Sequence, residues 1–539
     1  MKRSVLALFT LLVATSLFAE ETQRYIVVTK RPVRTEGIGA VLRELRADVQ
    51  PRAARAFESV NGFAADLTER EVAIVAQSPN VAWVEPVLER HALGEVATNA
   101  VSAQSMPYGI DLIQAPNVWV GAKGAAINVV VADTGIDFNH PELKAIYAGG
   151  INTFSATAAP FDDNSHGTHV AGTIAAADND IGVVGIAPSV RLWAAKVLAG
   201  DGRGSSEKLI QAIDWTIAKK KELGGNWVMN FSLGADRGSK IEGEAFARAV
   251  DAGIIVVAAS GNESEEGRPA PVLYPAAYPG IVSVGAIDSK SSLATFSNQG
   301  PEMDLVAPGV GVLSTVPIGT GELSYVMGKN RLSARALAGS PYGTITRSYV
   351  YCGLGRKEDI PANVSGKIAL VQRGEIRFSE KARNLKEAGA IAVVVYNNDA
   401  SDMNWTLKPA DEPQYASYEY PLTVGMTQAA GEALRAENGA SMTVSYEKDD
   451  YGTFNGTSMA TPHVAGAAAL LWSLQPNFTS STIINALTFT AKDLGTTGPD
   501  NQFGVGLVNV FEAAKLLSPN TFGQTVPPSG RRVLRRGRG

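Results

Sequence analysis

Two short apolar runs constrain the fold of this chain more than any other feature. Residues 127–132 and 254–259 are rich in valine, isoleucine and alanine, as buried strands are, and helix-like stretches alternate with such runs. This alternation predicts an α/β fold built on a mainly parallel sheet. Functional groups of such sheets gather at the carboxyl ends of the strands. Asp133 follows the first run directly and Asn262 comes shortly after the second, so both are well placed for a site.

Asp133, His166 and Ser458 are the residue types of a nucleophilic serine site, and they occur in that order. A serine hydroxyl is a poor nucleophile at neutral pH. It needs an imidazole to take its proton and a buried carboxylate to orient that imidazole. His169 is the rival for the role of base, but it falls within the helix predicted after His166, and we expect it to make structural hydrogen bonds.

The segments around these residues resemble the signatures of the subtilisin-like serine proteases nearly residue for residue. They read Asp-Thr-Gly at 133–135, His-Gly-Thr-His-Val-Ala-Gly at 166–172 and Gly-Thr-Ser-Met-Ala-Thr-Pro at 456–462. The order Asp, His, Ser is also that of subtilisin, a known example of this triad. The resemblance implies a three-layer α/β fold with a mainly parallel sheet. It also implies a secreted serine endopeptidase that acts through an acyl-enzyme intermediate.

Two groups are candidates for stabilising the oxyanion of such a reaction. Ser458 begins a helix predicted over 458–474, and helix amino ends present free backbone N–H groups and positive potential. The side-chain amide of Asn262 matches the oxyanion asparagine of the family. An asparagine after a strand can instead be an ordinary turn residue, which is the alternative for Asn262.

The resemblance also implies a cleft in which a substrate peptide pairs as an extended strand. Leu273 matches the base of the pocket for the residue before the scissile bond, and Glu263 matches its rim. We therefore expect a shallow pocket that favours medium apolar side chains, while Glu263 tolerates a basic one. The expected substrate-binding residues are Ser232, Leu233 and Gly234 on one edge, Gly202, Arg203 and Gly204 on the other, and Glu263 and Leu273.

A polar loop over residues 177–183 resembles the calcium-binding loop of the family. Calcium takes roughly six to eight oxygen ligands, which carbonyl, amide and carboxylate groups can supply. Glu142 stands where the family usually has aspartate, and a solvated polar loop without metal is the alternative. The expected ligands of this structural calcium are Gln104, Glu142, Ala177, Asn179, Ile181 and Val183.

The amino-terminal part is expected to be removed from the mature protein. Lys2 and Arg3 precede an apolar run, which is typical of a secretory signal peptide over 1–19; an uncleaved membrane anchor is the alternative. Residues 61–65 and 81–86 resemble segments of the inhibitory propeptides of the family, which assist folding and then hold their last strand in the active site. A propeptide is therefore expected over 20–102, and a plain structural domain is the alternative. The mature chain is then expected to begin near Ala103.

The catalytic domain is expected in two parts, 103–323 and 448–518. The insert between them, 324–447, resembles a protease-associated (PA) domain, a β-rich domain found in some larger relatives. Its cysteine, Cys352, is expected to be a buried apolar side chain and not a reactive thiol. The last residues, 519–539, are expected to form a flexible basic tail.

Composition limits the remaining possibilities. A chain of 539 residues should hold more than one domain, its net charge of -5 gives no reason to expect a nucleic-acid partner, and its single cysteine allows no intrachain disulfide. We expect an exported monomer without stable membrane insertion, acting on proteins or peptides. The alternatives are a catalytically inactive peptide-binding scaffold, an adhesion protein whose insert is functional, and a protease restricted to basic sites. The last is disfavoured because the cleft segments show no acidic cluster beyond Glu263.

Overall fold

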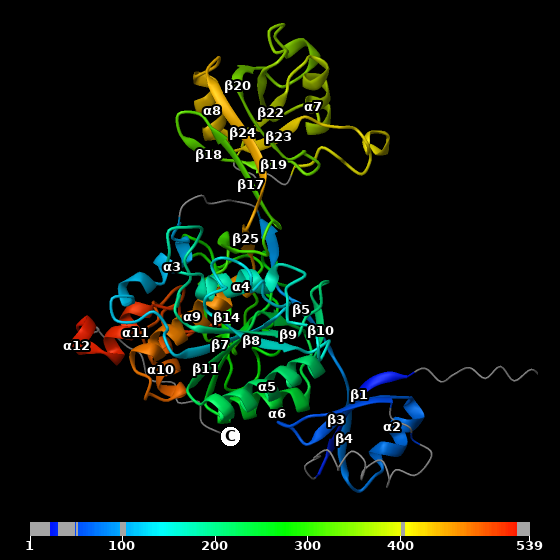
Figure 1. The fold of residues 1–539 in the computed structure, drawn as a ribbon, viewed down its shortest axis with the longest axis vertical. Helices are drawn as coiled ribbons and strands as arrows, with labels where there is room; N and C mark the ends of the chain where they lie inside the picture. Colours follow the sequence, from blue (N-terminus) through cyan, green and yellow to red (C-terminus); the bar gives the residue numbers. More distant parts are fainter. Residues whose placement is uncertain (1–21, 31–48, 50–51, 98–103, 400–404, 525–539) are drawn as a thin grey trace, which may run out of the picture. The chain divides into compact units, whose positions relative to one another are not determined.

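The computed structural model describes residues 22–30, 49, 52–97, 104–399 and 405–524. The predicted signal peptide, the expected mature start at Ala103 and the last residues of the basic tail lie outside the described residues. The chain divides into two compact units, residues 1–87 and 88–539, which are taken in turn (Figure 1). Among the described residues, no helix combines the length and the apolar character needed to cross a membrane.

The first unit is a small α+β domain, as predicted for the propeptide region. Its antiparallel sheet has the order β2-β3-β1-β4. Val27, Phe63 and Val75 are buried between this sheet and helix α2. The helix begins with a reciprocal cap, in which Thr68 and Glu71 each accept the backbone N–H of the other. The elements are β1 (Gln23–Thr29), β2 (Arg52–Ala56), β3 (Gly62–Leu67), α2 (Glu69–Ala76) and β4 (Val81–Pro86).

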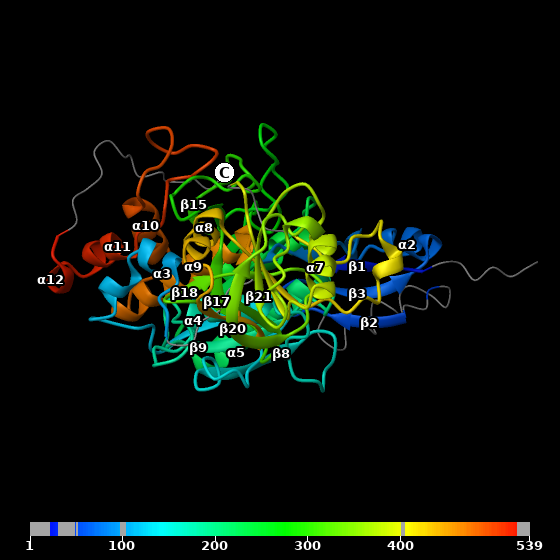
Figure 2. The same ribbon diagram turned by 90° about the horizontal axis from the view of Figure 1, so that it is seen from above.

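The second unit contains a seven-stranded sheet in the order β15-β14-β13-β11-β7-β9-β8, with every pair parallel. Both predicted strands are present, as β7 and β13. Helices α5 and α6 pack together on one face, and α4 and α9 pack together on the other (Figures 1 and 2). The strands are β7 (Ile127–Asp133), β8 (Tyr147–Asn152), β9 (Arg191–Lys196), β11 (Asn226–Phe231), β13 (Ile254–Ala259), β14 (Val282–Ile287) and β15 (Leu305–Pro308). The helices are α4 (His166–Ala175), α5 (Ser206–Leu223), α6 (Lys240–Asp251) and α9 (Thr457–Leu474).

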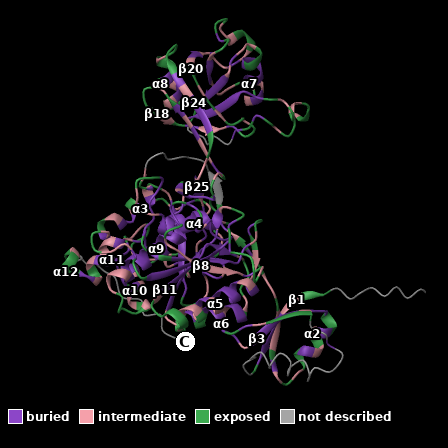
Figure 3. Cartoon of the chain, in the orientation of Figure 1, coloured by how far each residue is buried: buried purple, intermediate pink, exposed green. Residues whose placement is uncertain are grey.

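The centre of this sheet is buried on both faces, which explains why its strands lack a polar face. Every residue of β7 and β13 is buried, and α9 is buried from Thr457 to Trp472 (Figure 3). Parallel sheets covered by helices on both sides show this near-continuous apolar pattern. The predicted three-layer α/β fold is therefore confirmed. The remaining helices are α3 (Tyr108–Leu112), α10 (Ser480–Thr490), α11 (Val510–Leu517) and α12 (Pro519–Phe522).

Helix α9 contains a proline, and a pair of serines compensates for it. Pro462 has no N–H to donate to the carbonyl of Ser458, which lies one turn earlier in the helix. That carbonyl instead accepts the hydroxyl of Ser232 at 2.7 Å, and the Ser458 hydroxyl donates to the carbonyl of Ser232 at 2.8 Å. The serine pair therefore joins the start of α9 to the segment that follows β11.

The insert forms a domain with its own sheet and two apolar cores. Its eight strands have the order β18-β17-β24-β20-β21-β22-β23-β19, and the pairing opens with Gly321 opposite Asp449, slightly outside the expected limits of the insert. Cys352 is fully buried, and burial raises the pKa of its thiol to about 12, as expected for an unreactive side chain. The main elements are β17 (Gly321–Met327), β20 (Gly343–Tyr351), β21 (Ile368–Gln372), α7 (Phe378–Glu387), β22 (Ala392–Tyr396), β23 (Leu422–Met426), α8 (Gln428–Ala436) and β24 (Ser441–Asp449). Short strands β18 (Arg331–Ser333) and β19 (Arg335–Ala336) complete the sheet.

The serine pair predicts a cost for replacing Ser232 by alanine. The carbonyl of Ser458 would be left buried without a donor, which costs about 1–3 kcal/mol of the free energy of unfolding. Denaturant unfolding of Ser232→Ala in a Ser458→Ala background, which prevents self-digestion, measures this loss. Ser283→Ala is the matched control, because among the described residues its buried hydroxyl has no hydrogen-bond partner. Equal stability losses in the two variants would contradict the interpretation.

Candidate active site

Asp133 and His166 are brought together at the carboxyl edge of the sheet. Asp133 is the last residue of β7 and is fully buried, while His166 is the first residue of α4. The Asp133 Oδ1 and His166 Nδ1 atoms are 2.8 Å apart, and the same carboxylate oxygen accepts the N–H of Thr134 at 2.7 Å. Two hydrogen bonds therefore fix the carboxylate, which in turn orients the imidazole ring.

His166 and His169 differ in how readily their rings take up a proton. Burial lowers the pKa of His166, but the charge and hydrogen bond of Asp133 raise it, and the net shift is upward. Its Nε2 atom is buried and has no hydrogen-bond partner among the described residues. Burial lowers the pKa of His169 to about 3, and its Nε2 donates to the carbonyl of Val312 at 2.9 Å. His169 thus stays neutral and makes structural hydrogen bonds, whereas His166 can take up a proton.

The Ser458 hydroxyl donates to an acceptor other than His166. Ser458 is the second residue of α9, and its Oγ donates to the carbonyl of Ser232. Gly94 of a passing peptide segment occupies the space beside the imidazole. A Cβ atom added to Gly94 would lie 3.1 Å from His166 Nε2 and 3.2 Å from the sulfur of Met459. The hydrogen bond from serine to histidine is therefore not formed in this state, and such bonds often form only with bound substrate.

The peptide segment that passes the site is the end of the predicted propeptide, and it pairs with both expected cleft edges. Strand β5 (Glu89–Ala92) lies antiparallel between β10 (Arg203–Ser205) and β12 (Leu233–Gly234). The N–H of Ala92 also donates to the carbonyl of Gly202 at 3.0 Å. Beyond Leu93, strand β6 (Glu95–Ala97) pairs with β25 (Tyr451–Asn455). The backbone thus crosses the whole site as an extended strand.

The carbonyl of Leu93 lies at the predicted oxyanion position. It accepts the backbone N–H of Ser458 at 3.3 Å. Asn262 is oriented by Thr457, whose N–H and hydroxyl both donate to Asn262 Oδ1, at 2.9 and 2.8 Å. A Cβ added to Gly456 would lie 2.4 Å from the Leu93 oxygen and 3.1 Å from Asn262 Nδ2. Only glycine leaves room here for the carbonyl, and both predicted donors, the Ser458 N–H and Asn262 Nδ2, lie around it.

The Leu93 side chain is buried in a small cluster with Ala259 and Leu273. The assignment of Leu273 to the pocket for the residue before the scissile bond stays a prediction. One oxygen of the Glu263 carboxylate accepts the N–H of Asn262 at 2.9 Å and the amide of Asn298 at 2.7 Å, and the residue is exposed. The expectation that Glu263 tolerates a basic substrate side chain stays a prediction.

Glu242 is a cleft residue that the sequence analysis missed. It is the third residue of α6, and Ser239 caps its N–H at 3.2 Å, so the sequence there reads as an ordinary helix cap. Its carboxylate, however, binds Arg90 of β5 at 2.5 Å with both side chains fully buried. No signal in the sequence marks Glu242, because a glutamate three residues after a capping serine is the usual pattern at the start of a helix.

The predicted calcium residues assemble, but around hydrogen-bond donors. The Glu142 carboxylate accepts the N–H of Val183 at 3.1 Å, the side-chain amide of Asn179 at 2.9 Å and the hydroxyl of Tyr451 at 3.0 Å. Gln104 donates to Asp178 instead. A calcium ion needs oxygen acceptors pointing inward. In this structure these donors surround the Glu142 carboxylate, and the calcium site, including the carbonyls of Ala177, Ile181 and Val183, stays a prediction.

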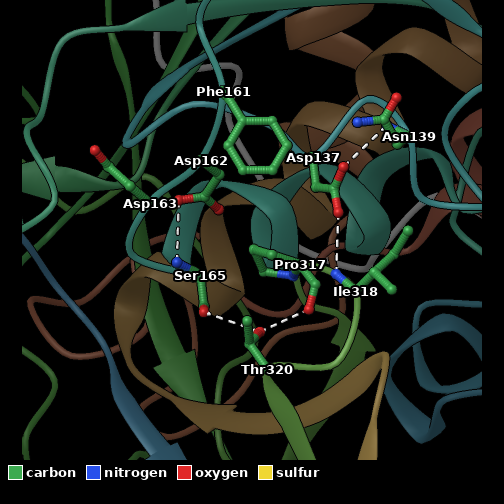
Figure 4. Close-up of a pocket in the computed structure, with 9 residues that line it drawn as sticks. All are labelled: Asp137, Asn139, Phe161, Asp162, Asp163, Ser165, Pro317, Ile318 and Thr320. Atoms are coloured by element: carbon green, nitrogen blue, oxygen red, sulfur yellow. Dashed lines mark hydrogen bonds between the residues drawn. The ribbon is translucent and has the colours of Figure 1, made fainter.

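A separate hollow of about 380 Å³ lies beside the start of α4 (Figure 4). Three carboxylates line it, and all are already paired. Asp137 accepts the N–H of Ile318 at 3.0 Å, Asp162 accepts the N–H of Ser165 at 3.0 Å, and Asp163 binds Lys196 at 2.6 Å. The hollow therefore offers no unpaired carboxylate for acid–base chemistry.

Comparison with known proteins agrees with this geometry. The model of the subtilase family matches residues 124–332 and 389–506, more than half of the chain, and the PA-domain model matches residues 321–434. Subtilisin E of Bacillus subtilis is 40% identical over 300 residues, which cover 55% of this chain and 74% of that protein. The thermostable alkaline protease of Halalkalibacterium halodurans is 39% identical over 300 residues, covering 55% and 75%.

A solved structure is similar over most of the chain. The psychrophilic subtilisin-like protease Apa1 of Pseudoalteromonas sp. AS-11 matches with a TM-score of 0.60 and 32% sequence identity, covering 78% of this chain and 100% of that one. Together with the matched family models and the sequence relatives, this shows that the chain belongs to the subtilase family and is a subtilisin-like serine endopeptidase with an inserted PA domain.

Proposed function

We propose that this endopeptidase cleaves peptide bonds through Asp133, His166 and Ser458 and is made as an exported zymogen that processes itself. The observation that carries the proposal is the carbonyl of Leu93, which accepts the N–H of Ser458. A peptide carbonyl at the amino end of α9 has the position of a substrate carbonyl before attack. Export is inferred from the signal-peptide pattern at residues 1–19.

In the proposed reaction, Ser458 Oγ leaves its contact with Ser232 and attacks the carbonyl carbon of the residue in the Leu93 position. His166 Nε2 takes the serine proton, while Asp133 accepts the Nδ1–H and stabilises the imidazolium that forms. The negative charge on the carbonyl oxygen is stabilised by the Ser458 N–H and the side-chain amide of Asn262. These donors are already oriented, so little reorganisation is needed as charge develops.

The second half of the reaction returns the proton. The C–N bond breaks, the leaving amine takes the proton from His166 Nε2, and the carbonyl carbon stays bonded to Ser458 Oγ as an ester. Water then enters the vacated side, gives a proton to Nε2 and attacks the ester. The acid product leaves, and Ser458 regains its proton from His166.

The same register supports self-processing between Leu93 and Gly94, earlier in the chain than the expected start at Ala103. The backbone pairs with cleft edges on both sides of this bond, so its carbonyl is held against Ser458. After the cut, β5 would keep its pairing with β10 and β12. The released propeptide would therefore remain as an inhibitor that occupies the cleft as a product.

Self-processing predicts a new amino terminus at Gly94. Purified precursor should convert with time to a shorter chain, and mass spectrometry of the new terminus identifies the bond. The Ser458→Ala precursor should stay intact, because no nucleophile is present. A wild-type chain that first appears with its terminus at Ala103 would contradict the register proposed here, and a fully intact wild-type chain would contradict self-processing.

The raised pKa of His166 predicts the acid side of the pH profile. His166 accepts a proton only in its neutral form, so kcat/KM should fall as the pH drops through the pKa of this residue. Because Asp133 raises that pKa, the midpoint should lie above the ordinary histidine value of about 6.5. Steady-state rates on one peptide between acid and mildly alkaline pH measure it. A midpoint well below that value would contradict the assignment of His166 as base.

Removing the charge of Asp133 gives the matching control for this profile. In Asp133→Asn the residual activity should titrate at lower pH than in the parent, because burial then acts on His166 without the opposing carboxylate. An unchanged midpoint in this variant would mean that another group controls the acid limb.

A further inference from the structure

Arg90, in the strand that fills the cleft, is fully buried, which is unusual for an arginine. Its guanidinium forms a two-pronged contact with Glu242: Nη2 to Oε2 at 2.5 Å and Nε to Oε1 at 3.3 Å. A third hydrogen bond runs from Nη1 to the carbonyl of Glu89 at 2.7 Å. This two-pronged contact matches the planar fork of a guanidinium, which arginine has and lysine lacks.

The backbone on both sides of Arg90 is held by hydrogen bonds to the catalytic domain. The N–H of Leu88 donates to the hydroxyl of Ser206 at 3.1 Å, and the Ser206 N–H donates to the carbonyl of Leu88 at 2.8 Å. On the other side, His91 pairs with Arg203 and Gly234. The Arg90 side chain thus enters its pocket from a strand whose register is fixed.

The pocket wall belongs to the catalytic domain and not to the propeptide. Glu242 lies on α6, where the Ser239 hydroxyl caps its N–H. The hydroxyl of Tyr278 accepts the N–H of Ser239 at 2.7 Å and donates to its carbonyl at 2.9 Å. Glu242 is therefore built into a rigid corner, and it would stay there after the propeptide leaves.

A buried carboxylate that loses its partner is costly in free energy. Glu242 should therefore favour substrates that bring a cation into its pocket. Breaking a buried ion pair by removing one member leaves an uncompensated charge, while refilling the pocket with a guanidinium restores the pair. A neutral side chain of similar length would not supply the charge that Arg90 brings to its two contacts with Glu242. The free cleft should therefore discriminate between these two classes of substrate.

We propose that Glu242 is a specificity-determining residue that selects arginine three positions before the residue whose carbonyl is attacked. The preferred substrates are then peptides and proteins with arginine at that position and a medium apolar residue such as leucine before the cleaved bond. The inference rests on the proposed function, because it takes Leu93 as the residue at the bond. This inference supports in part the alternative of a protease restricted to basic sites. The acidic residue, Glu242, lies on helix α6, outside the cleft segments that were expected from the sequence.

The test compares peptides on the processed enzyme. One peptide has the sequence of residues 89–96, and a second replaces Arg90 by citrulline, which has the same shape without the charge. The expected kcat/KM for the arginine peptide exceeds that for the citrulline peptide by roughly 30-fold or more. Glu242→Gln should cut the two peptides at nearly equal rates. Glu244→Gln, a half-buried glutamate on the same helix, is the matched control and should keep the parental ratio.

The possible results distinguish a failure of this inference from a failure of the proposed function. Equal rates for the two peptides on active parental enzyme would overturn the role of Glu242, while leaving the triad untouched. A preference that persists in Glu242→Gln would overturn it as well. The peptide comparison on the parent needs no variant, so it remains decisive if Glu242→Gln fails to fold. Failure of the parent to cut either peptide, at Leu93 or elsewhere, would instead contradict the proposed function.

Discussion

The amino end of helix α9 is the feature on which the whole site depends. This helix lies buried against the central strands, and its first turn supplies the Ser458 hydroxyl and the N–H that binds the Leu93 carbonyl. Its position is fixed by packing along almost its full length. The contact between Ser232 and Ser458 adds a link to one cleft edge, so this edge is tied directly to the proposed nucleophile. The positions of these groups therefore depend on how helix α9 packs against the parallel sheet.

Residues placed by local pattern were predictable from the sequence. Asp133 follows a strand with no polar face, and such strands lead polar residues to the carboxyl edge of a parallel sheet. The two cleft edges, 202–204 and 232–234, were assigned by resemblance, and both pair with the propeptide strand. The burial of Cys352 was also expected, because a free cysteine is among the most buried residue types.

Residues whose role depends on a distant partner were not predictable in the same way. The contact of Asn298 with the Glu263 carboxylate was not expected from the sequence. The hydroxyl of Tyr451, from beyond the insert, donates to Glu142, and this contact was not expected either. Glu242 sits in a sequence that reads as a helix cap, and only the fold brings it to Arg90. In each case the deciding contact joins segments that are far apart in the chain.

The central claim is that the segment ending at Leu93 occupies the cleft as a substrate does, with Ser458 as the nucleophile. The most direct measurement is the rate at which a fluorophosphonate probe labels Ser458 in propeptide-free protein, with and without a peptide of residues 88–93. The account predicts label on Ser458, none in Ser458→Ala, and slower labelling as the peptide fills the cleft. Folded protein that takes no label, or a labelling rate unaffected by saturating peptide, would contradict it.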